Sequence, residues 1–460
     1  MPDPDSHLQH GALEFPTFKI ETYSLAVRDD NGFVGDNASR PAFQSILQAW
    51  RTLFETLHGK DPLGDKPSEE IPKWRLDELM QKEGPAAAAI QGALEDYAEQ
   101  LGRVIRRFLN QESWKGVQRV IIGGGLKQSD IGALAIEAVA KRLFQDDVHI
   151  QLRLLHHHAD EGGLIGWLHL MPPDLAQRYR AMLAVDIGGT NIRCGIVRVP
   201  KNRNPRKAKV VIAEKWSHAR DDDATRKEHV VQGIADMLKK QIAYAKKKGI
   251  KLAPWVGVAC PGRIRQDGSI SRGTQNLPGD WAHPDFHLPR ALCKRLPRID
   301  GQQTQVMLHN DAVVQGLSEL PYLDDIRRWA VLTVGTGVGN ACYTIRGNRG
   351  EEPIEKTGKG KSKKAKAKKL KAIKPAFRTV STQDQTPDQP TSEEPTTTQA
   401  PTQATSPKKA ATKTARKTSP AKTATTKTAR KSPAKKATSK AVRKTAAKKA
   451  ASKNTRKIQP

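Results

Sequence analysis

The sequence feature that most constrains the fold is residues 183–198, in which two apolar runs flank a pair of glycines. Leu183–Val185 predicts a buried strand, and the second run, which ends at Val197, predicts a strand returning beside it. The segment therefore predicts a β-hairpin. Its turn combines a carboxylate, two positions without a Cβ atom and two side-chain donors, namely Asp186, Gly188, Gly189, Thr190 and Asn191.

Two interpretations of this turn follow from its residues. The glycines can let backbone N–H groups approach phosphate oxygens, with Thr190 and Asn191 adding donors. Asp186, at the end of the predicted strand, can then hold a Mg²⁺ ion through a water molecule. Alternatively, the glycines only supply the positive φ angles of a tight turn. The first interpretation requires partners for the loop elsewhere in the chain.

The charge of the chain is concentrated at its end. The formal net charge is +30 over 460 residues, but residues 356–460 contain 30 Lys and Arg against 4 Asp and Glu. Residues 1–355 are therefore close to neutral and long enough for a large core. The basic segment is rich in Lys, Ala, Thr, Ser and Pro and repeats TKTARK and SPAK. This composition predicts a disordered tail over 351–460.

The tail is similar to the tails of linker histones and bacterial histone-like proteins. Its charge predicts sequence-independent binding of DNA or RNA through phosphates by residues 356–460. The alternative is a solubilising polycation without a specific partner.

The cysteines and the hydropathy pattern exclude several classes of protein. Four cysteines are scattered along the chain without a C-x-x-C pair, which predicts no structural zinc and no disulfide framework and is typical of a reducing cytosol. No apolar stretch reaches about 18 residues, and the N-terminus lacks the pattern of a signal peptide. We therefore expect a cytoplasmic protein without a membrane partner. His156-His157-His158 is expected to be a loop, because consecutive residues point in different directions and converge poorly on a metal.

Strand and helix patterns alternate along the chain, which predicts an α/β fold with ligands at strand ends. Two more glycine-rich loops follow predicted strands, and a carboxylate, Asp311, follows a third. Phosphoryl transfer needs held phosphates, Mg²⁺ and a base for the hydroxyl proton. Asp311 is the candidate base, unless it only caps the helix that starts at Ala312. The loops contain Gly335, Thr336 and Gly337, and Gly123, Gly124 and Gly125.

Together, these motifs resemble the ROK family of sugar kinases and repressors. The resemblance implies a two-lobed actin/hexokinase-like (ribonuclease H-like) fold, ATP and Mg²⁺ as cofactors, and a hexose or hexosamine-like substrate. It implies Asp311 as the catalytic base and Asn276, Asn310, Asp311 and Gly262 as substrate-binding residues. It also leaves a homodimer open. The motifs are DIGGTN (186–191), GTGVG (335–339), VIIGGG (120–125), CPG (260–262) and NLPGDW (276–281).

The order of these motifs differs from that of the family. DIGGTN resembles the family's first phosphate motif, GTGVG its second phosphate motif and VIIGGG its adenosine loop. In the family, the adenosine loop follows the second phosphate motif. Here VIIGGG precedes DIGGTN, which predicts a circular permutation with new ends near Arg346. We expect a kinase domain over 1–350. One lobe would comprise about 30–160 with 331–350, and the other about 161–330.

Two departures from the family concern the substrate side. The Gly-Glu-x-Gly-His segment and the Cys/His zinc site of the family are absent, and Asn340 stands where the family usually has Gly. Two functions remain from the sequence. One is an ATP-dependent sugar kinase held at nucleic acid, and hence at the nucleoid, by its tail. The other is a catalytically weak sugar- or nucleotide-sensing regulator associated with DNA.

Overall fold

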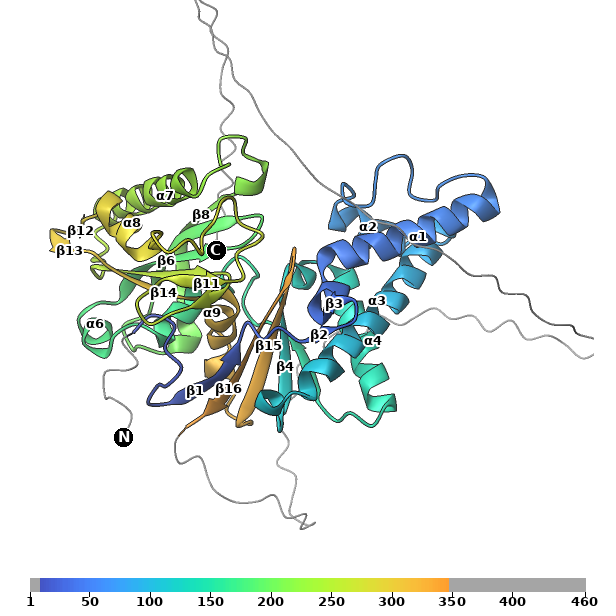
Figure 1. The fold of residues 1–460 in the computed structure, drawn as a ribbon, viewed down its shortest axis with the longest axis horizontal. Helices are drawn as coiled ribbons and strands as arrows, with labels where there is room; N and C mark the ends of the chain where they lie inside the picture. Colours follow the sequence, from blue (N-terminus) through green and yellow to red (C-terminus); the bar gives the residue numbers. More distant parts are fainter. Residues whose placement is uncertain (1–8, 347–460) are drawn as a thin grey trace, which may run out of the picture. The chain divides into compact units, whose positions relative to one another are not determined.

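The computed structural model describes residues 9–346, and the predicted tail at 351–460 lies outside this range. The described chain forms an α/β structure with two five-stranded mixed sheets (Figure 1). The first sheet has the order β14-β9-β6-β7-β8. Its strands are β6 (Ala181–Ile187), β7 (Ile192–Arg198), β8 (Lys209–Trp216), β9 (Trp255–Cys260) and β14 (Gln305–Asn310).

The second sheet has the order β1-β16-β15-β4-β5 and the same pattern of strand directions. In each sheet, three strands form an antiparallel meander, β6-β7-β8 in the first sheet and β15-β16-β1 in the second. Two further strands extend the sheet in parallel from the first strand of the meander, β9 and then β14 beside β6, and β4 and then β5 beside β15. This repeated pattern is that of the actin-like ATPase fold, so the fold class expected from the sequence is confirmed. The strands are β1 (Phe18–Tyr23), β4 (Arg119–Gly124), β5 (Gln151–Leu154), β15 (Arg328–Val334) and β16 (Val338–Ile345).

The third strand of the second meander comes from the beginning of the chain. β1 pairs antiparallel with β16, from Phe18 opposite Ile345 to Tyr23 opposite Ala341. In the first sheet the corresponding strand, β8, follows β7 directly along the chain. A strand from the start of the chain therefore completes the second sheet. β1 belongs to the lobe for which we expected about residues 30–160 and 331–350.

The central strands are apolar because both of their faces are covered. Every residue of β6 and of β9 is buried, which explains their continuous apolar runs. The predicted hairpin at 183–198 is confirmed: β6 and β7 pair from Ala181–Arg198 to Ile187–Ile192, and the turn between them spans residues 188–191.

Helices cover the outer faces of both sheets. A core of buried residues joins the second sheet to α3 and α4, and another joins the first sheet to α7 and α8. Figure 1 shows α1, α3 and α4 grouped beside β4. The helices are α1 (Arg40–His58), α2 (Lys73–Met80), α3 (Pro85–Leu109), α4 (Asp130–Gln145), α6 (Pro173–Arg178), α7 (Lys227–Lys247) and α8 (Leu288–Arg295).

Two short helices lie between the sheets. α9 (Asp311–Leu317) packs against strands of both sheets, and α5 (Gly162–Ile165) packs on α9. The core around them contains Trp167, Trp255, Trp329 and Tyr343, all essentially unexposed. The remaining strands are two-residue or three-residue pairs: β2 (Arg28–Asp29) with β3 (Gly32–Phe33), β10 (Arg263–Ile264) with β11 (Ile270–Arg272), and β12 (Arg298–Ile299) with β13 (Gln302–Gln303). Within residues 9–346, no helix is both long enough and apolar enough to cross a bilayer.

Candidate active site

A cleft of about 1090 Å³ lies at the strand ends that carry the predicted motifs. Residues from both sheets line it, including the turns of both glycine hairpins, so the structure brings the distant motifs together. Gly123 alone among the predicted site residues is not part of its lining. Those that line it are Asp186, Gly188, Gly189, Thr190, Asn191, Gly124, Gly125, Gly262, Asn276, Asn310, Asp311, Gly335, Thr336 and Gly337.

The glycines of the first hairpin allow close approach and do not supply positive φ angles. Neither Gly188 nor Gly189 is among the residues with positive φ. A Cβ atom on Gly189 would lie 2.9 Å from Cβ of Asn276, closer than side chains normally pack. The expectation that these glycines supply positive φ angles is therefore wrong, and at Gly189 the absence of a Cβ atom makes room for Asn276. His218 contacts the turn 188–191, with Nε2 2.8 Å from the carbonyl oxygen of Gly188.

The second hairpin, between β15 and β16, faces the first. The hydroxyl oxygens of Thr190 and Thr336 lie 2.9 Å apart, so the two turns are in direct contact. Asn276 lies beside both turns, since a Cβ atom on Gly337 would be 3.4 Å from its Nδ2. The backbone N–H of Arg40 donates to the carbonyl oxygen of Gly335 at 2.8 Å, which ties the start of α1 to this turn.

The glycine triplet is divided between the core and the cleft. Gly123 and Gly124 are the last residues of β4, and only Gly125 lies in the 3₁₀ turn that follows. A Cβ atom on Gly123 would lie 2.2 Å from Oε1 of Gln315 on α9. Gly123 therefore makes room for Gln315, which itself lines the cleft, while Gly124 and Gly125 form the wall. The backbone around Gly124 has φ +80°, which favours glycine.

Asp311 is the first residue of α9 and not its cap. The cap is Asn310, whose side chain accepts from the N–H of Val313 at 3.2 Å. Asp311 Oδ1 accepts from the adjacent N–H of Ala312 at 2.9 Å. The capping role that competed with catalysis is thus filled by its neighbour. Burial, followed by the charge of Asp186, raises the pKa of Asp311 to about 7.

The side chain of Asn310 is occupied by the protein itself. Besides capping α9, it donates through Nδ2 to the carbonyl oxygen of Gly262 at 3.0 Å and to Oγ of Ser24 at 3.2 Å. Only 2% of Asn310 is exposed. The residue therefore fixes the position of Asp311 relative to the Gly262 loop and to the end of β1.

Asp186 lies in a small network of charges at the floor of the cleft. Arg193 donates to Asp186 Oδ2 at 3.3 Å and to Asp160 Oδ1 at 2.6 Å. Lys215 donates to both oxygens of Asp160, at 3.2 and 3.1 Å. Burial raises the pKa of Asp186, and Arg193 opposes the shift. A Cβ atom on Gly163, at the start of α5, would lie 2.6 Å from the carboxylate carbon, so a glycine is required there.

The donor set at this floor is suited to Mg²⁺. Asp186 and Asp311 are carboxylates in one cleft, and the charge of the first raises the pKa of the second, a repulsion that a divalent cation would relieve. Hard oxygen donors such as these, with the hydroxyls of Thr190 and Thr336 nearby, are those that Mg²⁺ prefers.

Sequence reasoning missed several cleft residues. Arg193 had a local signal, because the hairpin register places it directly opposite Asp186. Gln315, Lys73 and Arg40 also line the cleft, but they reach it through long-range packing that no local pattern marks. In place of the missing Glu/His segment, the region after β1 contributes Arg28 and other residues to the cleft, namely Asn31, Gly32, Phe33 and Asp36.

The three consecutive histidines lie in the loop between β5 and α5. The ring of His156 stacks on Tyr322 with centroids 3.9 Å apart, and its backbone N–H donates to Glu319 Oε1 at 2.7 Å. Burial lowers the pKa of His157 to about 4, so it is neutral at pH 7. Within residues 9–346, no group of three His, Cys, Asp or Glu side chains is placed to hold a metal ion.

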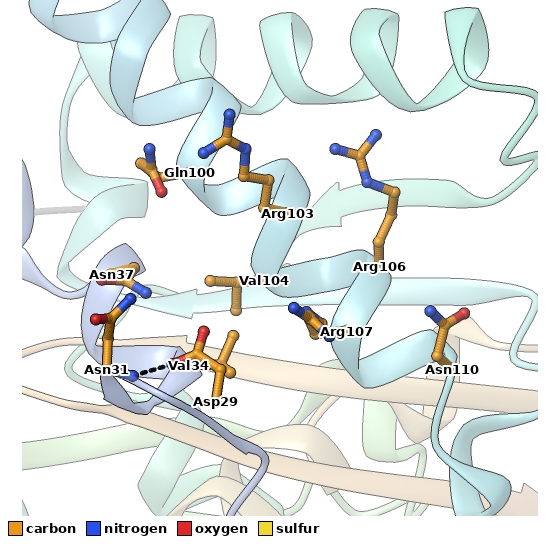
Figure 2. A pocket seen from close by; sticks show the side chains of 10 residues that line it. All are labelled: Asp29, Asn31, Val34, Asn37, Gln100, Arg103, Val104, Arg106, Arg107 and Asn110. Carbon is orange, nitrogen blue, oxygen red and sulfur yellow. Dashed lines mark hydrogen bonds between the residues drawn. The ribbon is translucent and has the colours of Figure 1, made fainter. Parts of the chain in front are cut away.

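A second pocket, of about 530 Å³, lies beside α3 and contains none of the predicted residues. Two of its three arginines are already paired with carboxylates, Arg103 with Glu99 and Arg106 with Asp146. Figure 2 shows their guanidinium groups pointing away from Asp29. The pocket is lined by Asp29, Asn31, Val34, Asn37, Gln100, Arg103, Val104, Arg106, Arg107 and Asn110.

The fold and the paired hairpins define an α/β protein resembling actin-like ATPases. No protein-family model matches the chain, and no curated protein sequence matches it. Solved structures with distant similarity include a Ppx/GppA family member from Aquifex aeolicus, with 13% identity and a TM-score of 0.21 over 36% of this chain and 50% of that chain. An exopolyphosphatase from Cytophaga hutchinsonii has 14% identity and a TM-score of 0.21 over 37% and 51%. An exopolyphosphatase-like protein has 10% identity and a TM-score of 0.26 over 53% and 86%.

This chain therefore spans about half the length of the first two of these proteins. The fold assignment rests on the strand order of the two sheets and on the position of the hairpins at their ends.

Proposed function

We propose that this protein is an ATP-dependent kinase that phosphorylates a hydroxyl group of a sugar or sugar-like polyol. The observation that carries the proposal is the state of Asp311. It lies in the same cleft as both glycine hairpins, a neighbour caps its helix, and its pKa is about 7. A carboxylate with a pKa near neutrality is suited to accept a proton and release it again.

The nucleotide would be held by backbone N–H groups at the strand ends. The two turns, 188–191 and 335–337, would receive the phosphates, and Gly124–Gly125 would form the wall beside the adenosine. Asp186 would hold Mg²⁺ through water. When bound, Mg²⁺ neutralises charge on the phosphates.

In the proposed reaction, Asp311 accepts the proton of the substrate hydroxyl while that oxygen attacks the terminal phosphorus of ATP. The bond from this phosphorus to the bridging oxygen breaks, ADP leaves with the electron pair, and Asp311 later returns its proton to water. Arg193 opposes the rise that burial causes in the pKa of Asp186, and Asn310 holds the peptide before Asp311 in place. Most of the rate enhancement in such reactions comes from positioning and electrostatics.

The resemblance to the ROK family supports a sugar as the acceptor. Asn276 and Gly262 line the cleft and remain the candidates for substrate contact. For Asn310 we propose a positioning role, because its amide group is already fully bonded within the protein.

The test is ATP turnover with a panel of hexoses, N-acyl hexosamines and polyols, measured as ADP release and as phosphorylated product. We expect one class of acceptor to increase ADP release well above that with water alone, and Asp311→Asn to lower it by at least 100-fold. The exposed Asp222→Asn is the matched control. Equal turnover by Asp311→Asn and the wild type would refute the role of Asp311.

The absence of the family's Glu/His segment favours a second candidate, a sensor that binds ATP and a sugar without turnover. Calorimetry separates the two. A sensor binds sugar in the presence of ATP and forms no product over hours, whereas a kinase consumes the sugar.

For the tail we propose a tether to nucleic acid, because residues 356–460 carry an excess of 26 positive charges. Phosphate contacts of this kind are independent of sequence and weaken steeply with salt. Removal of residues 356–460 is expected to abolish retention on DNA at 50 mM salt while leaving kinase turnover unchanged. In cells, the full chain would then be cytoplasmic and concentrated at the nucleoid. Equal DNA retention by the shortened protein would refute the tether.

A further inference from the structure

The cleft carries more positive than negative side chains. Six basic residues line it, against the carboxylates of Asp36, Asp186 and Asp311. A cleft with this imbalance attracts a polyanion, because its walls focus the field of the charges. The basic residues are Arg28, Arg40, Lys73, Arg193, Lys215 and Arg272.

Three of these cations, Lys73, Arg40 and Lys215, lie close to one another in the lining of the cleft. Burial lowers the pKa of Lys73, at the start of α2, and the nearby charges of Arg40 and Lys215 lower it further, while the carboxylate of Asp77 opposes the shift. Lys215 pairs with Asp160, which Arg193 also contacts. Within residues 9–346, neither Lys73 nor Arg40 forms a salt bridge.

Lys73 reaches the glycine wall directly. Its ammonium group donates to the carbonyl oxygen of Gly125, and a Cβ atom on Gly125 would lie 3.0 Å from Nζ. Arg40 begins α1 immediately beside the second hairpin, through its N–H bond to Gly335. Lys215 comes from β8 in the other sheet. The cations therefore reach the space between the glycine wall and the hairpins from both lobes.

The position of Lys73 is held by bonds on both sides. Before α2, the loop 59–72 is folded onto α1 by Arg51, which is 2% exposed and bonds to Asp61, Ser68 and the carbonyl oxygen of Gly64. Within α2, Asp77 accepts from the N–H of Ile131 at 3.0 Å, at the start of α4. The ammonium group of Lys73 is thus preorganised at the wall, so little entropy is lost when it binds a ligand.

We propose that Lys73, Arg40 and Lys215 form a subsite for the phosphate chain of the nucleotide, in addition to the two hairpins. This inference rests on the proposed function for the identity of the ligand, but the charge cluster requires only a chain of phosphates. A nucleoside triphosphate brings several negative charges between the wall and the hairpins and offsets the mutual repulsion of the cations.

Calorimetry with four probes tests the subsite: adenosine, ADP, ATP and inorganic tripolyphosphate. The variants are Lys73→Met and Arg40→Gln, with Lys66→Met, an exposed lysine of the preceding loop, as the matched control. We expect Lys73→Met and Arg40→Gln each to weaken ATP and tripolyphosphate binding about tenfold, ADP binding less, and adenosine binding not at all. Lys66→Met is expected to bind all four probes like the wild type.

The salt dependence provides a second readout. The affinity of Lys73→Met for tripolyphosphate is expected to fall less steeply with salt than that of the wild type, because one charge has been removed. Lys73→Arg, which keeps the charge, should recover most of the ATP affinity. Unchanged adenosine binding also shows that a variant is folded.

Three results would overturn the subsite. They are unaltered ATP and tripolyphosphate binding by both variants, an equal loss for adenosine and ATP, and absence of binding of every phosphate probe to the wild type. A wild type that binds tripolyphosphate through Lys73 but phosphorylates no acceptor would refute the proposed kinase and leave the subsite intact. If the protein phosphorylates an acceptor and substitution of Lys73 and Arg40 leaves ATP binding unchanged, the subsite is refuted and the proposed kinase is retained.

Discussion

The hydroxyl oxygens of Thr190 and Thr336 lie 2.9 Å apart although the residues are 146 positions apart in the sequence. Each threonine lies in the turn of a glycine hairpin, and the hairpins belong to different sheets. The two lobes therefore meet at the place where the proposed nucleotide phosphates would bind, and we expect phosphates bound there to separate the two hydroxyl groups.

This contact predicts a coupling that ATP removes. In a double-mutant cycle with Thr190→Val and Thr336→Val, we expect a coupling of about 1 kcal/mol in the free energy of unfolding without ligand. With saturating ATP the coupling should fall close to zero, because each hydroxyl then faces phosphate instead of the other. Urea unfolding with and without ATP measures both values. A coupling that is unchanged by ATP would place the phosphates elsewhere.

The pKa of Asp311 predicts the pH dependence of catalysis. The base must be ionised to accept a proton, so kcat/KM should rise about tenfold per pH unit below pH 7 and level off above it. Burial and the charge of Asp186 cause this position, so Asp186→Asn should move the midpoint downwards. Initial rates between pH 5 and 9 measure the curve. A plateau that already begins at pH 5 would contradict the raised pKa.

The same carboxyl group predicts a change in stability with pH. The folded protein holds the proton of Asp311 up to about pH 7, whereas the unfolded chain releases it near pH 4. The native state therefore binds the extra proton in this window, and stability falls as pH rises from about 4 to 7. Asp311→Asn removes this loss, so its stability relative to the wild type should rise by on the order of 2 kcal/mol from pH 5 to pH 8. Asp222→Asn, at an exposed position, should show no such trend in urea titrations.

Gly189 predicts a steric effect on the nucleotide site. A methyl group there would meet Cβ of Asn276 at 2.9 Å and displace the residue that lies beside both hairpins. We expect Gly189→Ala to weaken ATP binding about tenfold, and Asn276→Gly in the same chain to restore part of it. Gly102→Ala on α3, where the nearest atom would be 3.9 Å away, is the control and should be neutral or stabilising by about 0.5–1 kcal/mol. Equal effects of the two glycine substitutions would show that close approach does not matter at Gly189.

Arg51 predicts a large structural effect at a distance from the cleft. Arg51→Met removes a buried guanidinium and leaves Asp61 and the Gly64 carbonyl without their donor, which is expected to cost about 3 kcal/mol. Arg75→Met, on the exposed surface of α2, should cost less than about 0.5 kcal/mol. Urea unfolding compares the two. Since the Arg51 loop leads into α2, ATP affinity should fall with Arg51→Met as well.

Much of the site can be predicted from the sequence, because the residues that indicate it are close together in the chain. The apolar runs on either side of residues 188–191 determine a hairpin, and the hairpin register then pairs Asp186 with Arg193. Asn310 and Asp311 follow a buried strand and begin a helix, so both were expected near the cleft. Which of the two caps the helix could not be read from the sequence, because both side chains can accept the same kind of hydrogen bond.

The role of Gly123 could not be predicted from the neighbouring sequence. Within a triplet of identical residues nothing distinguishes the first from the others, yet its place is set by Gln315, 192 residues later along the chain. The steric need for a glycine at position 189 is similarly set by Asn276, a residue of a different loop. Such close approaches depend on the packing of helices and sheets and leave no mark in the neighbouring sequence.

The sequence by itself determined the alternation of strands and helices and the glycine turns at strand ends. Each of these depends on hydrophobic period and turn chemistry over a few neighbouring residues. Only the tertiary structure decided which side chains share the cleft, among them Lys73, Arg40 and Lys215. Their meeting depends on long-range contacts, such as the Arg51 loop and the packing of α2 on the start of α4, which arise only when distant segments bury their apolar faces together.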